Sequence, residues 1–254
     1  MFQIKELSKP TLKNTILIEG LPGMGNVGKI TVDFMVESLK AKKFIEIKSQ
    51  TFPNSVFINE KNLIEMPKIE MYYTTTKNNS IIFLCGDIQP MNERGCYAFC
   101  ESILDIFQKY NGKEIITIGG IGLPEIPDNP KIFATGNDEN IVKKYKDKNI
   151  KTNIYGVVGP IVGVTGLLLG LSKERNIPAV SLLAETFSHP SYLGLKGAKK
   201  VIDFLSKEFF LGIDTSDLEE EIKSIDIEEK NLSKELKKFL PKLSQGESGT
   251  NYIG

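Results

Sequence analysis

The sequence predicts an α/β fold built around a mainly parallel central sheet. Short apolar runs rich in β-branched residues alternate with longer amphipathic runs, and several connections between them are rich in glycine. The chain has 254 residues, of which 41% are hydrophobic and 25% charged, as in an ordinary globular protein. A chain of this length buries a full core without disulfides.

The predicted core elements follow one another from residue 15 to residue 210. Strands are predicted at 15–19, 44–49, 68–75, 80–85, 114–119, 153–158 and 179–183, and helices at 29–42, 95–110, from near Pro160 to 170, and 194–210. Two hairpins, turning at 59–62 and at 77–79, predict an antiparallel portion near residues 55–85. The glycine- and proline-rich residues 120–136 are predicted to form a long loop.

The segment Thr152–Ser172 is uncharged and long enough to span a bilayer. It also holds glycines four residues apart, as helices packed in membranes do. The alternative is a buried strand, a Gly-Pro turn and a buried helix, and the five glycines favour this alternative. We therefore expect no membrane span, and glycines that let the helix lie close to the sheet or to another subunit.

The composition turns acidic and helical after residue 213. We expect a core domain at 1–213, an amphipathic helical extension at 214–243 and a flexible tail at 244–254. An apolar stripe at a/d-type spacing runs along the extension: Leu218, Ile222, Ile225, Leu232, Leu236 and Phe239. The extension is either a helix folded back on the core or an arm for oligomerisation or partner binding.

Composition excludes several classes of site. The 32 basic and 32 acidic residues give a formal net charge of zero, which argues against a general nucleic-acid binder. The single histidine rules out a multi-histidine metal site, and Cys96 and Cys100 have no second metal-binding pair. An odd count of three cysteines fits a reduced, cytoplasmic compartment, and the N-terminal residues do not resemble a signal peptide.

The run Gly20–Gly28 joins the first predicted strand to the first predicted helix. Gly23, Gly25 and Gly28 fit the G-x-G-x-x-G fingerprint, whose amides approach a pyrophosphate, and Glu46 lies 18 residues further on. The alternative is a tight turn whose glycines permit close packing, which the proline in the loop and the hairpins that follow favour. The candidate residues of this loop are Gly20, Gly23, Gly25, Asn26 and Gly28.

Three further loops follow predicted strands and place polar or glycine residues at strand ends. The candidates are Asp87 and Asn92 after one strand, Gly120 after another, and Glu185 and His189 after a third. Because the carboxyl ends of parallel strands lie at one edge, the loops are able to rim one pocket. Such a pocket would suit a nucleotide- or nucleoside-binding hydrolase or transferase in which Glu185 and His189 take part in general acid–base catalysis. The alternative is that these two residues fix a loop or a subunit contact.

The glycine run with its flanking elements, the loop at 119–124, the glycine helix at 156–170 and Ala184–Pro190 occur in this order. In these segments the chain resembles the archaeal branch of the proteasome assembly chaperone family, over about residues 10 to 210. The resemblance implies a three-layer α/β/α core similar to nucleoside phosphorylases and related hydrolases. It implies no catalytic residues, no metal and no cofactor.

The resemblance also implies self-association as a homo-oligomer and binding to proteasome α subunits. Relatives use a C-terminal hydrophobic-Tyr-any tail to enter pockets between α subunits. This sequence ends Asn251-Tyr252-Ile253-Gly254, so the tyrosine is third from the end rather than second. We expect Tyr252, Ile253 and Gly254 to act as a flexible anchor if the tail docks. The sequence thus predicts a cytoplasmic, non-enzymatic assembly factor that binds neither nucleic acid nor membrane.

Overall fold

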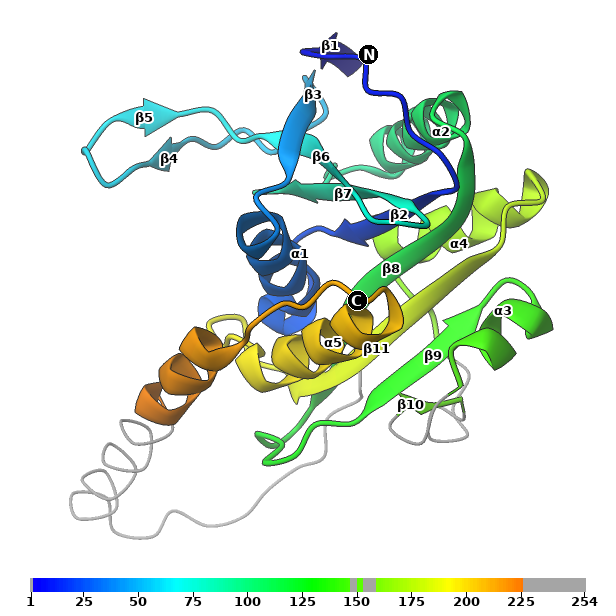
Figure 1. Cartoon of the computed structure of the whole chain (residues 1–254). Coiled ribbons are helices and arrows are strands. Elements are labelled where there is room, and N and C mark those ends of the chain that lie inside the picture. Colours follow the sequence, from blue (N-terminus) through cyan, green and yellow to red (C-terminus); the bar gives the residue numbers. More distant parts are fainter. Residues whose placement is uncertain (1, 147–149, 153–158, 226–254) are drawn as a thin grey trace, which may run out of the picture.

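The structure is a computed structural model that describes residues 2–146, 150–152 and 159–225. A nine-stranded mixed sheet lies between two layers of helices (Figure 1). The strands of the sheet, in chain order, are β1 Phe2–Glu6, β2 Thr15–Gly20, β3 Lys42–Ser49, β6 Ile69–Thr75, β7 Ser80–Gly86, β8 Gly112–Leu123, β9 Ile132–Gly136, β10 Ile150–Lys151 and β11 Ala179–Phe187. The helices are η1 Met24–Asn26, α1 Val27–Ser38, α2 Glu93–Lys109, α3 Glu139–Lys144, α4 Val164–Glu174 and α5 Leu195–Glu208.

The prediction of a mainly parallel sheet is correct for its centre and for the β9–β10 pair at one edge. The strand order is β1-β3-β6-β7-β2-β8-β11-β9-β10, and β7, β2, β8 and β11 run parallel to one another. The β1–β3, β3–β6, β6–β7 and β11–β9 pairs are antiparallel. Part of the antiparallel portion arises because the chain reverses from β3 to β6 and from β6 to β7 without a crossover helix, whereas parallel neighbours need a long crossover connection.

Both predicted hairpins are confirmed. β6 and β7 pair antiparallel in the main sheet. The first hairpin, β4 Phe57–Ile58 with β5 Ile64–Glu65, forms a separate two-stranded sheet that projects from the body of the molecule (Figure 1).

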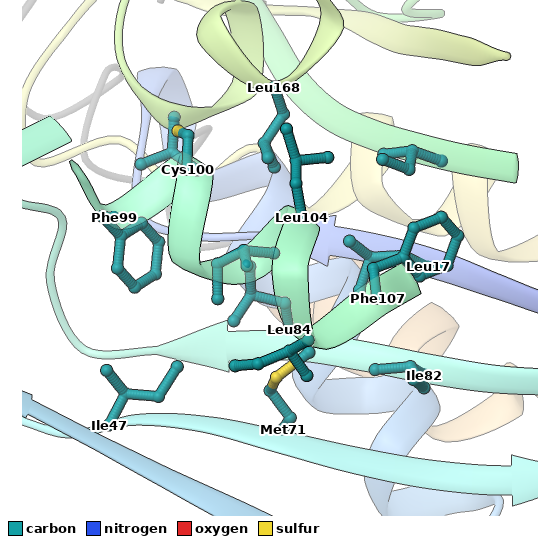
Figure 2. Packing of buried hydrophobic residues seen from close by; sticks show 14 of the residues in the cluster. Leu17, Ile47, Met71, Ile82, Leu84, Phe99, Cys100, Leu104, Phe107 and Leu168 are labelled. Atoms are coloured by element: carbon teal, nitrogen blue, oxygen red, sulfur yellow. The ribbon is translucent and has the colours of Figure 1, made fainter. Parts of the chain in front are cut away.

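Strand alternation divides the core between the two faces of the sheet. Along β2, Leu17 packs with the layer of α2 and α4, whereas Ile16 and Ile18 pack with the layer of α1, α3 and α5. Figure 2 shows the first of these layers, where Phe99 and Leu104 of α2 lie over the strands. The two apolar layers on either side of one sheet give the three-layer arrangement that the sequence predicts.

Several predicted boundaries are wrong for local reasons. The predicted loop at 120–136 contains the end of β8 and all of β9, because glycine-rich β8 pairs with β11 as far as Leu123. The first helix ends at Ser38 rather than near residue 42, since Lys40 has a φ of +48° and the chain then enters β3. The glycine helix begins at Val164, four residues after Pro160, following a Gly163 with a φ of +84°. The short elements β1, α3 and β10 were not predicted.

The start of the predicted C-terminal extension is helical over residues 216–225. Leu218 is buried, and Ile222 and Ile225 pack partly buried against the same core cluster as α1 and α5. The rest of the apolar stripe, the predicted strand at 153–158 and the tail residues Tyr252, Ile253 and Gly254 lie outside the described residues. Within the described ranges, no helix has the length and apolarity that crossing a membrane requires.

Candidate functional site

The predicted candidate loops come together at one side of the sheet. We call this side the carboxyl edge: it comprises residues 20–28, 50–68, 86–97, 123–131, 159–163 and 187–194, which follow the strands β2, β3, β7, β8 and β11 or precede α4. In Figure 1 the projecting hairpin, the start of α1 and the start of α5 mark this edge on the left-hand side of the molecule. Ligand and partner sites of α/β proteins are usually built on this edge.

Close packing explains the glycines where the loop meets β2 and β8. A Cβ atom on Gly20 would lie 2.2 Å from the Gly28 carbonyl oxygen, and one on Gly28 would lie 2.5 Å from the Ile118 carbonyl oxygen. The absence of both side chains therefore allows α1 to lie directly on β2 and β8.

The tip of the glycine loop adopts left-handed backbone conformations. Gly25 has a φ of +61° and Asn26 a φ of +51°, and the Asn26 amide donates to the Gly23 carbonyl oxygen at 2.9 Å. A Cβ on Gly25 would lie 2.3 Å from Thr186 Oγ1, at the end of β11. Position 25 therefore needs glycine both for its backbone conformation and for the lack of space for a side chain. Gly23, by contrast, is exposed to solvent.

Neighbouring loops hold the glycine loop from three sides. The Gly194 amide donates to the Gly25 carbonyl oxygen at 2.7 Å, which fixes the start of α5. A Cβ on Gly120 in β8 would lie 2.2 Å from the Met24 carbonyl oxygen. Gln89, which the predicted candidate set did not include, donates through Nε2 to the Pro22 carbonyl oxygen and accepts from the Val164 amide at 3.0 Å. The atoms nearest to the loop are therefore protein atoms of three other segments.

A buried carboxyl group lies directly beneath the glycine loop. Glu19 is fully buried, accepts from the Leu21 amide at 3.0 Å and accepts from Thr165 Oγ1 at 3.3 Å. Burial raises the pKa of Glu19 to about 8, so the side chain is mainly protonated at neutral pH. No sequence pattern marks this group, because one glutamate in an apolar strand has no characteristic spacing.

Asp87 and Asn92 serve the local backbone. Asp87 accepts from the Lys68 amide at 3.1 Å and lies 3.5 Å from the Lys29 ammonium group, so it joins the end of β7 to the start of β6 and to α1. Asn92 is the N-cap of α2 and accepts from the Gly95 amide at 2.7 Å. Both side chains have the contacts of structural residues.

Glu185 and His189 lie in different surroundings. Glu185 is buried and accepts from the Lys131 amide at 2.8 Å, and the Lys131 ammonium group lies 3.9 Å from its other oxygen. His189 is exposed, stacks on Phe187 with ring centroids 5.8 Å apart, and accepts from the Ser191 amide. The contacts of Glu185 thus fix the segment before β9, and those of His189 fix its own loop.

Large hydrophobic side chains that are exposed gather at the carboxyl edge. Most large hydrophobic residues that are exposed in the described part of the chain lie there: Val56, Phe57, Ile58, Leu63, Ile64, Met66, Met91, Tyr97, Ile126, Val162 and Leu193. Contiguous exposed apolar surface usually marks a site of protein or ligand binding. The first hairpin forms at the predicted residues, but a hairpin pattern in a sequence does not show which of its side chains are exposed.

A groove of about 430 Å³ opens between the first turns of α2 and α4. Its walls are largely apolar and include Met91, Cys96, Tyr97, Ile161, Val162 and Leu167. Of the predicted candidate residues, only Asn92 contributes to it. In the described residues, no group of three or more His, Cys, Asp and Glu side chains is placed to hold a metal ion.

The fold and this edge define the class: a three-layer α/β protein in which Asp87, Asn92 and Glu185 serve the fold and most of the exposed large hydrophobic side chains lie at the strand ends. The chain belongs to the PAC2 family, whose model matches residues 17–233. This confirms the resemblance to proteasome assembly chaperones that the glycine run and the later segments indicate.

Individual relatives agree with this assignment over nearly the whole chain. Uncharacterized protein MJ1210 of Methanocaldococcus jannaschii is 30% identical over 263 residues, with 100% of both chains covered. The crystal structure of PbaB of Pyrococcus furiosus, an archaeal proteasome activator, is 32% identical with a TM-score of 0.84, covering 91% of this chain and 98% of PbaB. PbaA of the same organism, an archaeal homologue of proteasome-assembly chaperone, is 24% identical with a TM-score of 0.75, covering 92% and 93%, and supports the fold.

Proposed function

We propose that this chain is a cytoplasmic, non-enzymatic assembly factor that self-associates and binds proteasome α subunits, holding them in register until rings form. The observation that carries the proposal is that most of the exposed large hydrophobic side chains of the described residues lie at the carboxyl edge, whereas the contacts of Asp87 and Glu185 join segments of the fold. The likeness to PbaB, an archaeal proteasome activator, supplies the class of partner. A modest apolar contact with polar surroundings suits a factor that must release its product.

The packing of the glycine loop supports a structural role for it. Gly20, Gly25 and Gly28 each approach protein atoms more closely than a Cβ would allow. Glu185 and His189, the residues of the alternative hydrolase or transferase, have contacts that fix separate segments. We therefore expect ATP, NAD and nucleosides to leave the thermal unfolding midpoint unchanged, whereas a saturable rise with one of them would favour the enzyme.

Affinity capture of the tagged full chain from a native lysate tests the partner. We expect mass spectrometry of the captured proteins to find proteasome α subunits or their assembly intermediates. Capture without any α subunit would contradict the proposal. Leu193→Asp, which places a charge on the carboxyl edge, is expected to reduce capture, and Phe210→Asp is the matched control on a side chain that is 91% exposed outside this edge.

The role of the C-terminal tail in binding is tested by comparing the full chain with a shortened one. If Tyr252, Ile253 and Gly254 anchor the chain, removal of residues 244–254 weakens capture of α subunits without lowering the unfolding midpoint. Equal capture by the full and the shortened chain would assign the binding to the folded core alone.

A further inference from the structure

The hairpin of β4 and β5 is an arm that projects from the body of the molecule, and its large apolar side chains are exposed in the part of the chain that the structure describes (Figure 1). The register pairs Phe57 with Glu65 and Ile58 with Ile64. Because side chains that face each other across a ladder lie on the same side, Ile58 and Ile64 share one face of the ribbon, and they are 70% and 71% exposed. Val56 and Met66, which flank the two strands, are 50% and 63% exposed. An isolated two-stranded ribbon is at best marginally stable in water, so this face requires a partner.

The turn of the arm is specified by its own sequence. Asn59 Oδ1 accepts from the amides of Lys61 and Leu63, and Asn59 Nδ2 donates to Glu65 Oε1 at 2.7 Å. Asn62 occupies the left-handed conformation with a φ of +58°. The arm is thus a formed element with an uncovered face.

The groove between α2 and α4 has complementary properties. Its volume of about 430 Å³ is well above the roughly 150 Å³ that accepts a benzene ring, so it accommodates several aliphatic side chains. Met91 and Val162 on its walls are 74% and 60% exposed. The groove therefore has the size and the apolar lining to receive the uncovered face of an arm.

Gly170 gives independent support for close approach by another chain at the groove. It lies inside α4, is exposed, and a Cβ built on it meets no atom within 4 Å. Glycine in an exposed helix interior costs about 1 kcal/mol relative to alanine. No contact within the described chain accounts for that cost, whereas a backbone or side chain of a second molecule resting on α4 would.

We propose that the β4–β5 arm of one copy of this chain docks in the α2–α4 groove of a second copy. This deepens the self-association in the proposed function and rests on it. Within one copy the arm does not enter the groove: its base is held beside the start of α2, where the Met91 amide donates to the Thr51 carbonyl oxygen, and the ribbon points away from the body (Figure 1). Each copy offers one arm and one groove, so the contact is heterologous and closes into a ring when the rotation between copies closes.

The mass of the purified full chain in solution tests this contact without any proteasome subunit present. We expect the wild type to form an assembly of several 28.3 kDa chains, and both Ile58→Asp/Ile64→Asp and Gly170→Leu to fall to the mass of one chain. Leucine is a better helix former than glycine, so Gly170→Leu keeps the fold while it fills the groove. The control Phe210→Asp is expected to keep the wild-type mass. A monomeric wild type, or wild-type mass in both groove and arm variants, would overturn the proposal.

Disulfide trapping tests the pairing itself and does not depend on disruptive variants. In a Cys96→Ser background, Ile58→Cys and Val162→Cys chains are co-expressed and then oxidised. We expect a covalent dimer from the mixture and none from either chain alone. Dimers of Ile58→Cys alone would show arm-to-arm contact. The absence of a covalent product from the mixture would show that the arm does not lie in the groove. Either result overturns the proposal.

A shortened chain tests whether the C-terminal segment, rather than the arm, makes the contact between copies. Removal of residues 226–254 is expected to leave the mass of the assembly unchanged. Dissociation on this removal would assign the contact to the C-terminal segment and overturn the proposal. Because these measurements use the chain alone, their failure is distinguishable from failure to capture α subunits.

Discussion

Single residues in the glycine loop determine how closely α1 lies on the sheet. Gly25 combines a φ of +61° with a position where a Cβ would lie 2.3 Å from Thr186 Oγ1. The sequence shows the glycines but not the cause of their presence, since a phosphate cradle and tight packing need the same residue type. The distinction depends on which atoms of β8, β11 and α5 approach, and these come from segments far along the chain.

Gly25→Ala should destabilise the protein more than Gly212→Ala does. Gly212 has nearly the same φ, +63°, but a Cβ there meets no atom within 4 Å. We expect Gly212→Ala to lower the free energy of unfolding by about 1 kcal/mol from backbone strain alone, and Gly25→Ala to lower it further through the clash. Urea unfolding of both variants measures the difference. Equal losses would mean that the loop is open at Gly25, as a ligand cradle would be.

Glu19 makes stability depend on pH. Its pKa is raised to about 8 by burial in the folded chain and lies near 4.5 when the chain is unfolded. Between these values the folded state holds a proton that the unfolded state has released, so stability is present at low pH and is lost as pH rises towards 8. One such group gives a slope of about 1.4 kcal/mol per pH unit.

Glu19→Gln should remove this part of the pH dependence. A neutral amide keeps an oxygen for the Leu21 amide and never needs to ionise in the core. We expect the wild type to lose stability between pH 5 and pH 9 while the variant loses much less, as measured by urea unfolding at both pH values. The same loss in wild type and variant would show that Glu19 is not the group responsible.

At the scale of elements, the sequence predicts the helices and strands that local patterns determine. It misses the boundaries that depend on contacts with segments far along the chain. β2, β6, β7 and α2 follow clear periodicities, and the two hairpins follow their turn residues. The end of β8 was predicted as loop because Gly119, Gly120 and Gly122 usually break strands. Here Gly120 is required by the approach of the Met24 carbonyl oxygen, a contact that no local pattern contains.

The packing of α4 on α2 is reinforced by a single arginine at the end of α4. Arg175 forms ion pairs with Glu101 and with Asp105, the latter at 2.7 Å, and donates to Gln108 at 2.8 Å. We expect Arg175→Met to lower the free energy of unfolding by about 1 kcal/mol, less in high salt, because its partners are largely solvated. The exposed Lys173→Met in the same helix is the control. A change no larger than that of the control would contradict a clamp between α2 and α4.

At the scale of the molecule, the gathering of the loops at one edge follows from strand order, which the alternation of elements predicts for the parallel centre. Which residues of that edge join segments of the fold, and which are exposed to a partner, could not be predicted from strand order. Asp87 and Glu185 resemble site residues in the sequence, but in the structure their contacts join segments of the fold. Conversely, Ile58 and Ile64 have the pattern of an ordinary hairpin, because the sequence does not show which face another element covers.

We propose that the exposed hydrophobic side chains of the carboxyl edge let the chain act on proteasome subunits. Native mass spectrometry of purified proteasome α subunits, mixed with the full chain, tests this directly. We expect complexes of the chain with α subunits and a larger fraction of complete α rings than the subunits form alone. Spectra showing only the separate components, with an unchanged fraction of rings, would contradict it.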